Sequence, residues 1–289
     1  MKESVSKMIV ENRDTMLILI DIGAFAFKDF MKENSDQVKN IGIFEPGTIS
    51  IAAGLALSGI TPTVYGISPF IVQRSLEQLK LNFIYQNLGG NFITTGASYD
   101  FSKLGYSHYC PEDVETLKTL PGMEILIPGT PKQFETLFEK CCMNNKTSYF
   151  RMTDYSNSLD VDVEFGKATI IKRGQLATVI SFAETLDTVV SACDDLDVTI
   201  LYYTTAAPFD LETLHNNIQS GKIFVCEPFY KGTFYRDILD ATRGELVQID
   251  GIGVPREIIR TYGTKKEKDL HLGFTCENIR EKLNNFINA

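Results

Sequence analysis

The chain has 289 residues, which is enough for two domains of ordinary size. Apolar residues make up 44% of the sequence, as in a globular protein, and 37 acidic residues against 28 basic ones give a net charge of -9. This excess of acid argues against non-specific binding to nucleic acid or to an anionic membrane as the main activity.

Targeting signals and metal-ligand patterns are not evident in the sequence. The N-terminal segment MKESVSKMIVENRD has no apolar core of signal-peptide length, and no later apolar run is long enough to span a bilayer. We therefore expect a cytoplasmic protein. The six cysteines form no CxxC pair and have no histidine at metal-ligand spacing. This pattern favours buried thiols over a disulfide framework or a metal site.

Strands and helices are predicted to alternate along the first half of the chain. The predicted strands are 16–22, 40–44, 63–67, 91–95, 123–128 and 148–152, and the predicted helices are 24–32, 46–57, 69–87, 111–120 and 131–142. This alternation is typical of a mostly parallel sheet covered by helices on both faces.

A polar and acidic stretch, TDYSNSLDVDVEF, follows the first half and has neither a helical nor a strand-like period. We place a linker there, at 153–166, between a domain of residues 1–152 and a domain of residues 167–289. The second domain repeats the pattern, with strands predicted at 168–173, 176–183, 198–204, 222–227 and 245–250 and helices at 184–196 and 276–288. The predicted fold class is α/β, with two domains that each contain a mostly parallel sheet covered by helices.

One acid, Glu45, stands at the turn between a predicted strand and a predicted helix. An apolar run ends at Phe44, Pro46 suits the first turn of a helix, and an Ala-, Gly- and Leu-rich segment continues to Leu57. The start of a helix favours a carboxylate, and the carboxyl edge of an open α/β sheet is where ligands bind. Position alone leaves two interpretations of Glu45: a carboxylate that stabilises the helix start, or a functional acid.

Two longer motifs resemble a known family. The stretch 41–70, IGIFEPGTISIAAGLALSGITPTVYGISPF, is followed by RSLEQLK and resembles the pyrimidine-binding domain of thiamine-diphosphate enzymes of the transketolase group. That group includes transketolase, 1-deoxyxylulose-5-phosphate synthase and the β subunit of 2-oxoacid dehydrogenases. The stretch 105–131, GYSHYCPEDVETLKTLPGMEILIPGTP, is similar to the family's His-containing loop and the elements after it. Residues 167–289 resemble the family's C-terminal domain through weaker motifs.

The resemblance implies a cofactor site for thiamine diphosphate. Glu45 corresponds to the glutamate that hydrogen-bonds N1′ of the pyrimidine, so that the cofactor can form its own carbanion at C2. Phe70 stands where the family has an aromatic that packs on the pyrimidine ring, although its residue type also suits a core phenylalanine. Asp21 matches a position near the pyrimidine or else caps the next turn. Gln73 is a further candidate cofactor contact.

The resemblance also bears on the substrate. His108 stands where relatives have a Thr-His pair, and it is expected to hydrogen-bond substrate oxygens and shuttle protons; the other interpretation is an ordinary loop histidine. Leu104 replaces an acid that transketolases commonly use to bind the donor sugar. Asp154 stands where sugar-phosphate enzymes often have an arginine, and a carboxylate there repels a phosphate. Either Arg151 compensates, or the substrate is not phosphorylated in the usual way.

A further departure concerns the other half of the cofactor site. Full-length relatives begin with a domain whose Gly-Asp-Gly and downstream Asn hold Mg²⁺ and the diphosphate, and this sequence has no such element in that context. The resemblance therefore implies a split enzyme. This chain is expected to be its C-terminal subunit, with a separate N-terminal diphosphate-binding transketolase subunit as partner in an α₂β₂ assembly that holds most of the Mg²⁺ site.

Three functions remain open. The first is a subunit of a transketolase-like enzyme that transfers a two-carbon ketol unit from a ketose, a sugar or sugar phosphate, to an aldehyde through the thiamine-diphosphate carbanion. The second keeps the cofactor but decarboxylates a 2-oxoacid such as pyruvate, followed by carboligation or by acyl transfer in a dehydrogenase complex. The third is a non-catalytic binding subunit, against which the joint presence of Glu45, Phe70 and His108 argues. None of the three involves nucleic acid or a membrane.

Overall fold

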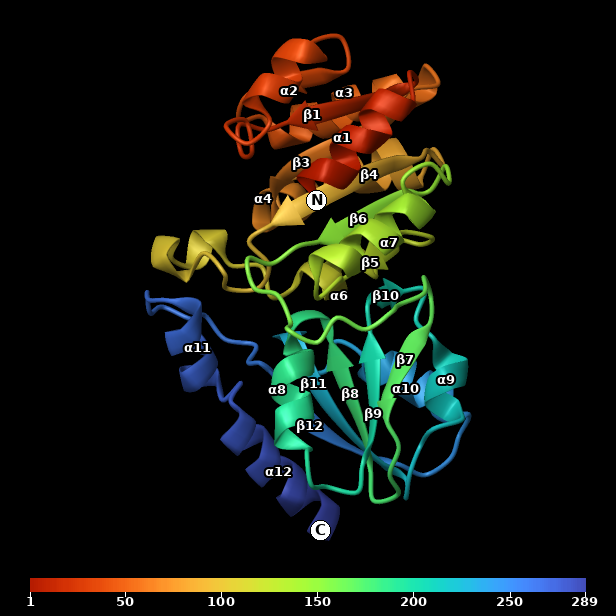
Figure 1. Cartoon of the computed structure of the whole chain (residues 1–289), viewed down its shortest axis with the longest axis vertical. Coiled ribbons are helices and arrows are strands. Elements are labelled where there is room, and N and C mark those ends of the chain that lie inside the picture. Colours follow the sequence, from red (N-terminus) through yellow and green to blue (C-terminus); the bar gives the residue numbers. More distant parts are fainter.

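The computed structural model describes all 289 residues and shows two α/β units, each built on one sheet (Figure 1). The first sheet has seven strands in the order β10-β5-β6-β4-β3-β1-β2, and the second has five in the order β12-β11-β8-β9-β7. Only the pairs β10 with β5 and β7 with β9 are antiparallel. The predicted fold class, two mostly parallel sheets covered by helices, is confirmed.

The strands are short and mostly buried. Their bounds are β1 Thr15–Leu19, β2 Val38–Asn40, β3 Thr61–Ile67, β4 Gly90–Thr95, β5 Glu124–Leu126, β6 Thr147–Arg151, β7 Ala168–Lys172, β8 Thr178–Phe182, β9 Thr199–Tyr203, β10 Thr205–Ala207, β11 Lys222–Tyr230 and β12 Gln248–Val254. Most of them overlap the predicted ranges, because a buried parallel strand reads as a continuous apolar run.

The α-helices are α1 Lys2–Glu11, α2 Lys28–Glu33, α3 Glu45–Leu57, α4 Ser68–Val72, α5 Leu76–Gln78, α6 Asp113–Leu117, α7 Pro131–Cys141, α8 Leu186–Ala192, α9 Leu211–His215, α10 Tyr235–Thr242, α11 Lys265–Leu272 and α12 Cys276–Asn288. Short segments of other helix types are the π-helix η1 Leu79–Ile84 and the 3₁₀ turns η2 Ser102–Leu104, η3 Tyr106–His108 and η4 Ala183–Thr185. None of the helices combines the length and the apolar character that a membrane crossing requires.

Two predicted elements before α3 differ from the structure. The strand predicted at 40–44 is wrong, because β2 ends at Asn40 and the following residues form a loop in which Ile43 and Phe44 are exposed. The helix predicted from residue 24 begins only at Lys28, because residues 23–27 form successive turns. In both places the apolar residues belong to an irregular segment rather than to a regular buried element.

The continuous helix predicted from Pro69 is also wrong. The structure breaks it into α4, α5 and the π-helical segment, with turn residues 73–75 between the first two. The hydroxyl of Ser75 donates to the backbone carbonyl of Phe70 at 3.1 Å. Such a side-chain bond competes with the regular helical ladder and favours a break at this place.

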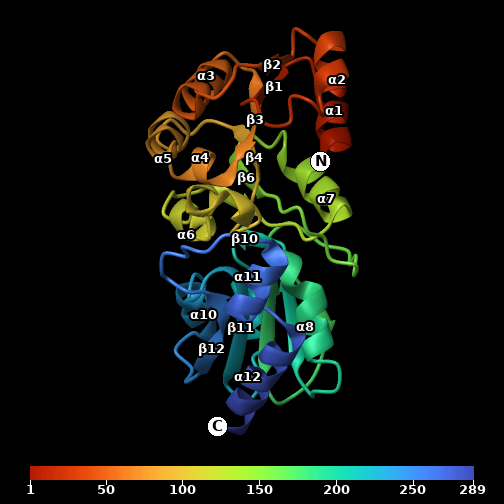
Figure 2. The ribbon, with the colours of Figure 1, turned by 90° about the vertical axis from the view of Figure 1, so that its left-hand side faces the viewer.

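Helices cover both faces of the first sheet, as the side view shows (Figure 2). On one face, α3, α4 and α6 contribute buried residues such as Ile49, Val72 and Val114 to the largest apolar cluster. On the other face, α1 and α7 contribute Val5 and Phe134 to a second cluster, against which α2 also packs. The largest cluster continues into the second unit, so the two sheets share one core.

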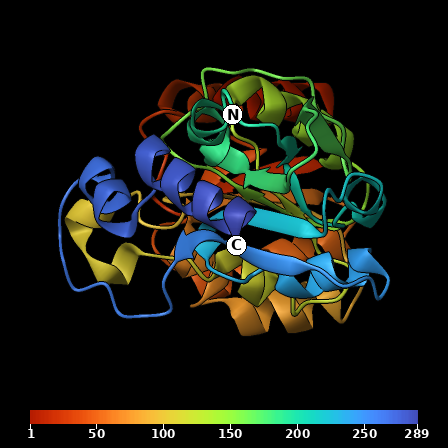
Figure 3. The ribbon, with the colours of Figure 1, turned by 90° about the horizontal axis from the view of Figure 1, so that it is seen from below.

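Two further features join the units. Strand β10 comes from the C-terminal half but extends the first sheet by pairing with β5. The segment that includes α11 lies beside the loop 97–110 (Figure 3), where the Tyr109 hydroxyl donates to the Thr261 carbonyl at 2.9 Å and the Tyr99 hydroxyl to Asp269 at 2.7 Å. The loop that carries His108 is therefore held by the C-terminal unit. The division of the chain at 153–166 stays a prediction.

Candidate active site

A pocket of about 230 Å³ opens at the carboxyl edge of the first sheet, beside the start of α3. Its lining consists of Ile20, Asp21, Ile22, Ile43, Glu45, Ile67 and Phe70. The segment after β1 contributes Asp21, α3 contributes Glu45, and α4, directly after β3, contributes Phe70. Parallel strands bring these distant segments to one edge, so three of the predicted site residues lie around one cavity.

Glu45 forms a nearly buried acidic wall of this pocket. It is the first residue of α3, and its side chain is only 5% exposed. The carboxylate Oε2 accepts a hydrogen bond from Nη1 of Arg74 at 2.9 Å. A buried carboxylate without a partner is costly, so this ion pair, together with the positive end of the helix dipole, stabilises the charge of Glu45.

Arg74 contacts the pocket's aromatic residue as well. Its Cζ atom lies 4.1 Å from the centre of the Phe70 ring, which is the geometry of a cation-π contact. The Arg74 side chain is 46% exposed and is not among the residues that line the pocket. The sequence pattern did not single out Arg74, although in the continuous helix predicted there its four-position spacing from Phe70 would place both side chains on one face.

His108 contacts the same aromatic ring. The imidazole and Phe70 rings meet edge to face, with their centres 5.2 Å apart. Ser107 Oγ lies 3.0 Å from the Nδ1 atom of His108, which leaves Nε2 free for another partner. Partial burial, and then the nearby charge of Arg74, lower the pKa of His108. The imidazole is therefore mostly neutral at pH 7 and can both donate and accept a hydrogen bond.

Asp21 and Gln73 lie in different surroundings. Asp21 has a left-handed backbone, with φ of 62°, and is held there by Asn40. The Asp21 amide donates to Asn40 Oδ1 at 3.0 Å, and Asn40 Nδ2 donates to Asp21 Oδ1 at 3.3 Å. Gln73 lies outside the pocket lining, and its side-chain amide donates to Glu112. Burial raises the pKa of Glu112, whose other carboxylate oxygen has no hydrogen-bond partner.

A buried chain of hydrogen bonds fixes the start of α4, the helix that carries Phe70. Ser68 Oγ donates to Thr94 Oγ1 at 3.0 Å, and Thr94 Oγ1 donates to the Tyr149 hydroxyl at 2.9 Å. The Tyr149 hydroxyl in turn donates to Asp113 Oδ2 at 3.1 Å. All of these side chains are buried, so the chain positions α4 against the sheet.

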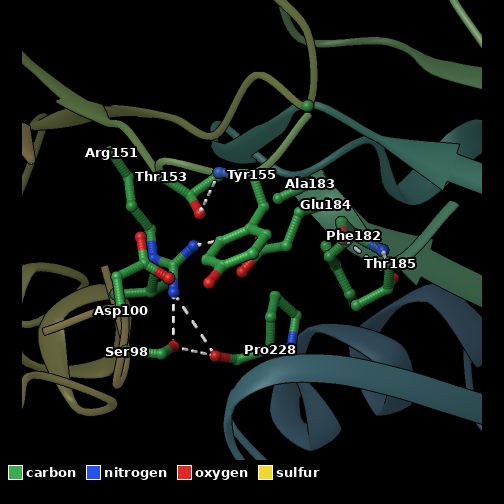
Figure 4. A network of polar contacts seen from close by, with 12 residues as sticks. Ser98, Asp100, Arg151, Thr153, Tyr155, Phe182, Ala183, Glu184, Thr185 and Pro228 are labelled. Atoms are coloured by element: carbon green, nitrogen blue, oxygen red, sulfur yellow. Dashed lines mark hydrogen bonds and ion pairs between the residues drawn. The ribbon is translucent and has the colours of Figure 1, made fainter. Parts of the chain in front are cut away.

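The chain of hydrogen bonds ends at Arg151, between the two units (Figure 4). The guanidinium is fully buried and donates to Asp113 at 3.0 Å, to Glu184 at 3.3 Å and to Ser98 Oγ at 2.5 Å. Burial lowers the pKa of Arg151, but Asp113 and Glu184 raise it by more. With these partners the guanidinium is shielded from solvent. This argues against the interpretation that Arg151 compensates for Asp154 at a phosphate, which stays a prediction.

Comparisons with known proteins identify the family of this chain. The model of the transketolase pyrimidine-binding domain family matches residues 3–155. The chain belongs to this family. The resemblance predicted from the sequence is thus confirmed, and it extends beyond the pyrimidine-binding domain to nearly the whole chain.

Two curated relatives and one solved structure cover this transketolase-family chain almost completely. It is 32% identical to an uncharacterized 33.6 kDa protein in the fasciation locus of Rhodococcoides fascians, over 94% of this chain and 88% of that protein. It is 25% identical to a protein of Phocaeicola vulgatus that is named as one subunit of an apulose-4-phosphate transketolase, over 99% and 95%. A split-gene transketolase solved as an inactive β4 tetramer has the same fold, with a TM-score of 0.86 at 19% identity over 99% of this chain and 96% of that one.

Proposed function

We propose that the chain is the pyrimidine-binding subunit of a two-component transketolase, and that Asp21, Glu45 and Phe70 form its site for the pyrimidine of thiamine diphosphate. The observation that carries the proposal is the pocket, in which a nearly buried carboxylate and an aromatic side chain line one cavity of about 230 Å³. A flat aminopyrimidine uses both, since it stacks on an aromatic ring and hydrogen-bonds through its ring nitrogen. The residues present fit this end of the cofactor.

The same lining does not suit the diphosphate end of the cofactor. It contains the carboxylates of Asp21 and Glu45 and no basic side chain, and like charges repel. We therefore assign the diphosphate and its Mg²⁺ mainly to a separate N-terminal subunit. The relative from Phocaeicola vulgatus is itself named as one subunit of a transketolase and is covered over 95% of its length, which supports an enzyme divided between two chains.

A surface with exposed apolar side chains, on both sides of Glu45 along the chain, supports such a partner. The loop residues Phe25, Ile43 and Phe44 are exposed, and α3 presents Ile51 and Leu57 on its outer side. Groups of large exposed apolar side chains next to a ligand site are typical of a protein interface. We propose that the diphosphate-binding subunit covers this surface in an α₂β₂ assembly and completes the cofactor site there.

The residues of this chain then have distinct tasks. Thiamine diphosphate, when bound, supplies the nucleophilic carbon for transfer of a two-carbon ketol unit from a ketose to an aldehyde. Glu45 holds a proton at N1′ of the pyrimidine, and Phe70 supports the face of the ring. His108, mostly neutral at pH 7, exchanges hydrogen bonds with substrate oxygens through Nε2. A cofactor contact by Gln73 stays a prediction, because its amide is bound to Glu112.

The test uses the assembled enzyme. The chain is co-purified with a subunit that carries the Gly-Asp-Gly motif, and ketol transfer and thiamine-diphosphate binding are measured. We expect Glu45→Gln to reduce turnover by about a hundredfold or more, the usual contribution of one acid-base group. Glu115→Gln is the matched control, because Glu115 is also paired with an arginine, Arg256, but lies outside the pocket. Turnover of Glu45→Gln equal to that of the wild type would contradict the proposed role of the pocket.

The choice of donor separates the alternatives. A ketose phosphate consumed with transfer of two carbons and without release of CO₂ supports the transketolase proposal. Release of CO₂ from pyruvate would instead favour the 2-oxoacid enzyme. An assembled complex that binds no cofactor would favour the non-catalytic subunit.

A further inference from the structure

Arg74 is not part of the pocket lining, but it contacts the two lining residues that a pyrimidine ring is proposed to use, Glu45 and Phe70. Its Nη1 atom donates to the Glu45 carboxylate at 2.9 Å, and its Cζ atom lies 4.1 Å from the centre of the Phe70 ring. A guanidinium resembles an aminopyrimidine, since it is flat, carries N–H donors and has delocalised electrons that stack on aromatic rings. The arginine and the pyrimidine therefore compete for the same carboxylate and the same aromatic ring.

The two partners of the ion pair differ in how far their side chains are exposed to solvent. The Glu45 side chain is 5% exposed and belongs to the pocket wall, whereas the Arg74 side chain is 46% exposed. Glu45 is the only acid that forms an ion pair with Arg74. A released guanidinium can regain water at once, but Glu45 needs a new hydrogen-bond partner when Arg74 leaves. A ligand that takes the place of Arg74 satisfies both requirements.

We propose that Arg74 holds Glu45 and Phe70 in the cofactor-free chain, and that the cofactor displaces it by replacing these two contacts. This inference rests on the proposed function. It follows that the Glu45 charge stays neutralised before the cofactor arrives, and that the affinity for the pyrimidine is reduced by the work of moving Arg74.

The chain provides a matched arrangement outside the pocket. Arg256 donates to both oxygens of Glu115 at 2.7 and 2.9 Å, and its Cζ atom lies 5.2 Å from the centre of the Tyr230 ring. Like Arg74, it is about half exposed. Arg256→Ala therefore removes the same kind of paired and stacked arginine without touching the pocket lining.

Isothermal titration calorimetry of the full chain with 4-amino-2-methylpyrimidine tests the inference. This probe is the cofactor's heterocycle alone, so the titration needs no diphosphate-binding subunit. We expect Arg74→Ala to bind the probe roughly three- to tenfold more tightly than the wild type, the combined size of a half-exposed ion pair and a cation-π contact. Arg74→Lys should fall in between, because an ammonium pairs with Glu45 but does not stack as a plane. Arg256→Ala should bind like the wild type.

Further variants make the outcome decisive. Circular dichroism melting establishes that each variant is folded, and Arg74→Met, which keeps an apolar contact with Phe70, replaces Arg74→Ala if the latter does not fold. Equal or weaker binding by the Arg74 variant overturns the inference. If Glu45→Gln then binds more weakly than the wild type, the proposed function still stands. If neither the wild type nor the Arg74 variant binds the probe, the proposed function is contradicted together with the inference.

Discussion

Arg151 and Arg74 show two different uses of a paired arginine in one chain. Arg151 lies between the two units, is fully buried and is bound by Asp113, Glu184 and Ser98. Arg74 contacts two residues of the pocket lining, Glu45 and Phe70, is about half exposed and has one ion-pair partner. The hydrogen-bonding groups around Arg151 are all supplied by the protein, whereas at the pocket a ligand can replace Arg74 as the partner of Glu45. Burial and the number of partners thus separate a structural ion network from a candidate binding site.

The largest expected effect comes from breaking the buried network. Arg151→Met leaves the carboxylates of Asp113 and Glu184 inside the protein without their cation. We expect a loss of roughly 3–5 kcal/mol in the free energy of unfolding, measured by denaturant titration. A loss below about 1 kcal/mol, the size of an exposed pair, would contradict the structural role of Arg151.

A smaller effect, dependent on pH, is expected at Asp100, which lies beside Arg151 (Figure 4). Burial, and then the charge of Glu184, raise the pKa of Asp100 to about 7, and its Oδ1 atom has no hydrogen-bond partner. Because the folded pKa lies above the unfolded value of 3.8, the folded state binds the proton more tightly. This contribution to stability is complete below about pH 4 and is lost as the pH rises towards 7.

Asp100→Asn removes that titration. We expect the variant to be more stable than the wild type at pH 8, by on the order of 2 kcal/mol, and to lose part of its pH dependence between about pH 4 and pH 7. Denaturant unfolding at pH 4 and pH 8 measures both. The part of the pH dependence of stability that comes from Glu227 remains in the variant, since burial raises the pKa of Glu227 to about 7 as well. An unchanged pH dependence in the variant would contradict the assignment.

Arg74→Ala tests the second of the two arginines in the same way. Its ion pair is half exposed and lies at the start of α3, where the helix dipole also favours the Glu45 charge. Because the nearly buried Glu45 then keeps only the helix dipole, we expect the variant to lose on the order of 1–3 kcal/mol in the same unfolding measurement. If it loses as much as Arg151→Met, the distinction between a structural network and an exchangeable pair does not hold.

The smallest effect concerns His108. Burial and the charge of Arg74 both lower its pKa, so Arg74→Ala should raise the titration midpoint of the imidazole towards its ordinary value. Nuclear magnetic resonance resolves the chain's three histidines, and His215 and His271 serve as internal controls. A midpoint for His108 that does not change would show that the Arg74 charge does not reach this ring in solution.

The sequence predicted which residues line the pocket better than it predicted the local backbone around them. Family motifs pointed to Asp21, Glu45 and Phe70, and the structure gathers all three around one cavity, although their roles remain proposals. The strand predicted at 40–44 failed for a physical reason. An apolar run predicts that its side chains avoid water, but it does not predict which surface they pack against. Here Ile43 and Phe44 lie exposed beside the pocket instead of in a buried strand.

Long-range pairings could not be predicted from the sequence. Arg74 and Glu45 are 29 positions apart, and Arg151 lies 38 and 33 positions from Asp113 and Glu184. Such pairs leave no local period, because helical and strand patterns record only neighbours along one element. Strand β10 was missed for the same reason, since it has three residues and its partner β5 belongs to the other unit.

A crystal structure of the assembled enzyme with thiamine diphosphate tests the central claim most directly. We predict that the pyrimidine ring stacks on Phe70 with N1′ within hydrogen-bond distance of the Glu45 carboxylate, and that the Arg74 guanidinium no longer contacts either residue. A pyrimidine bound elsewhere, or one bound while Arg74 keeps both contacts, would contradict the account.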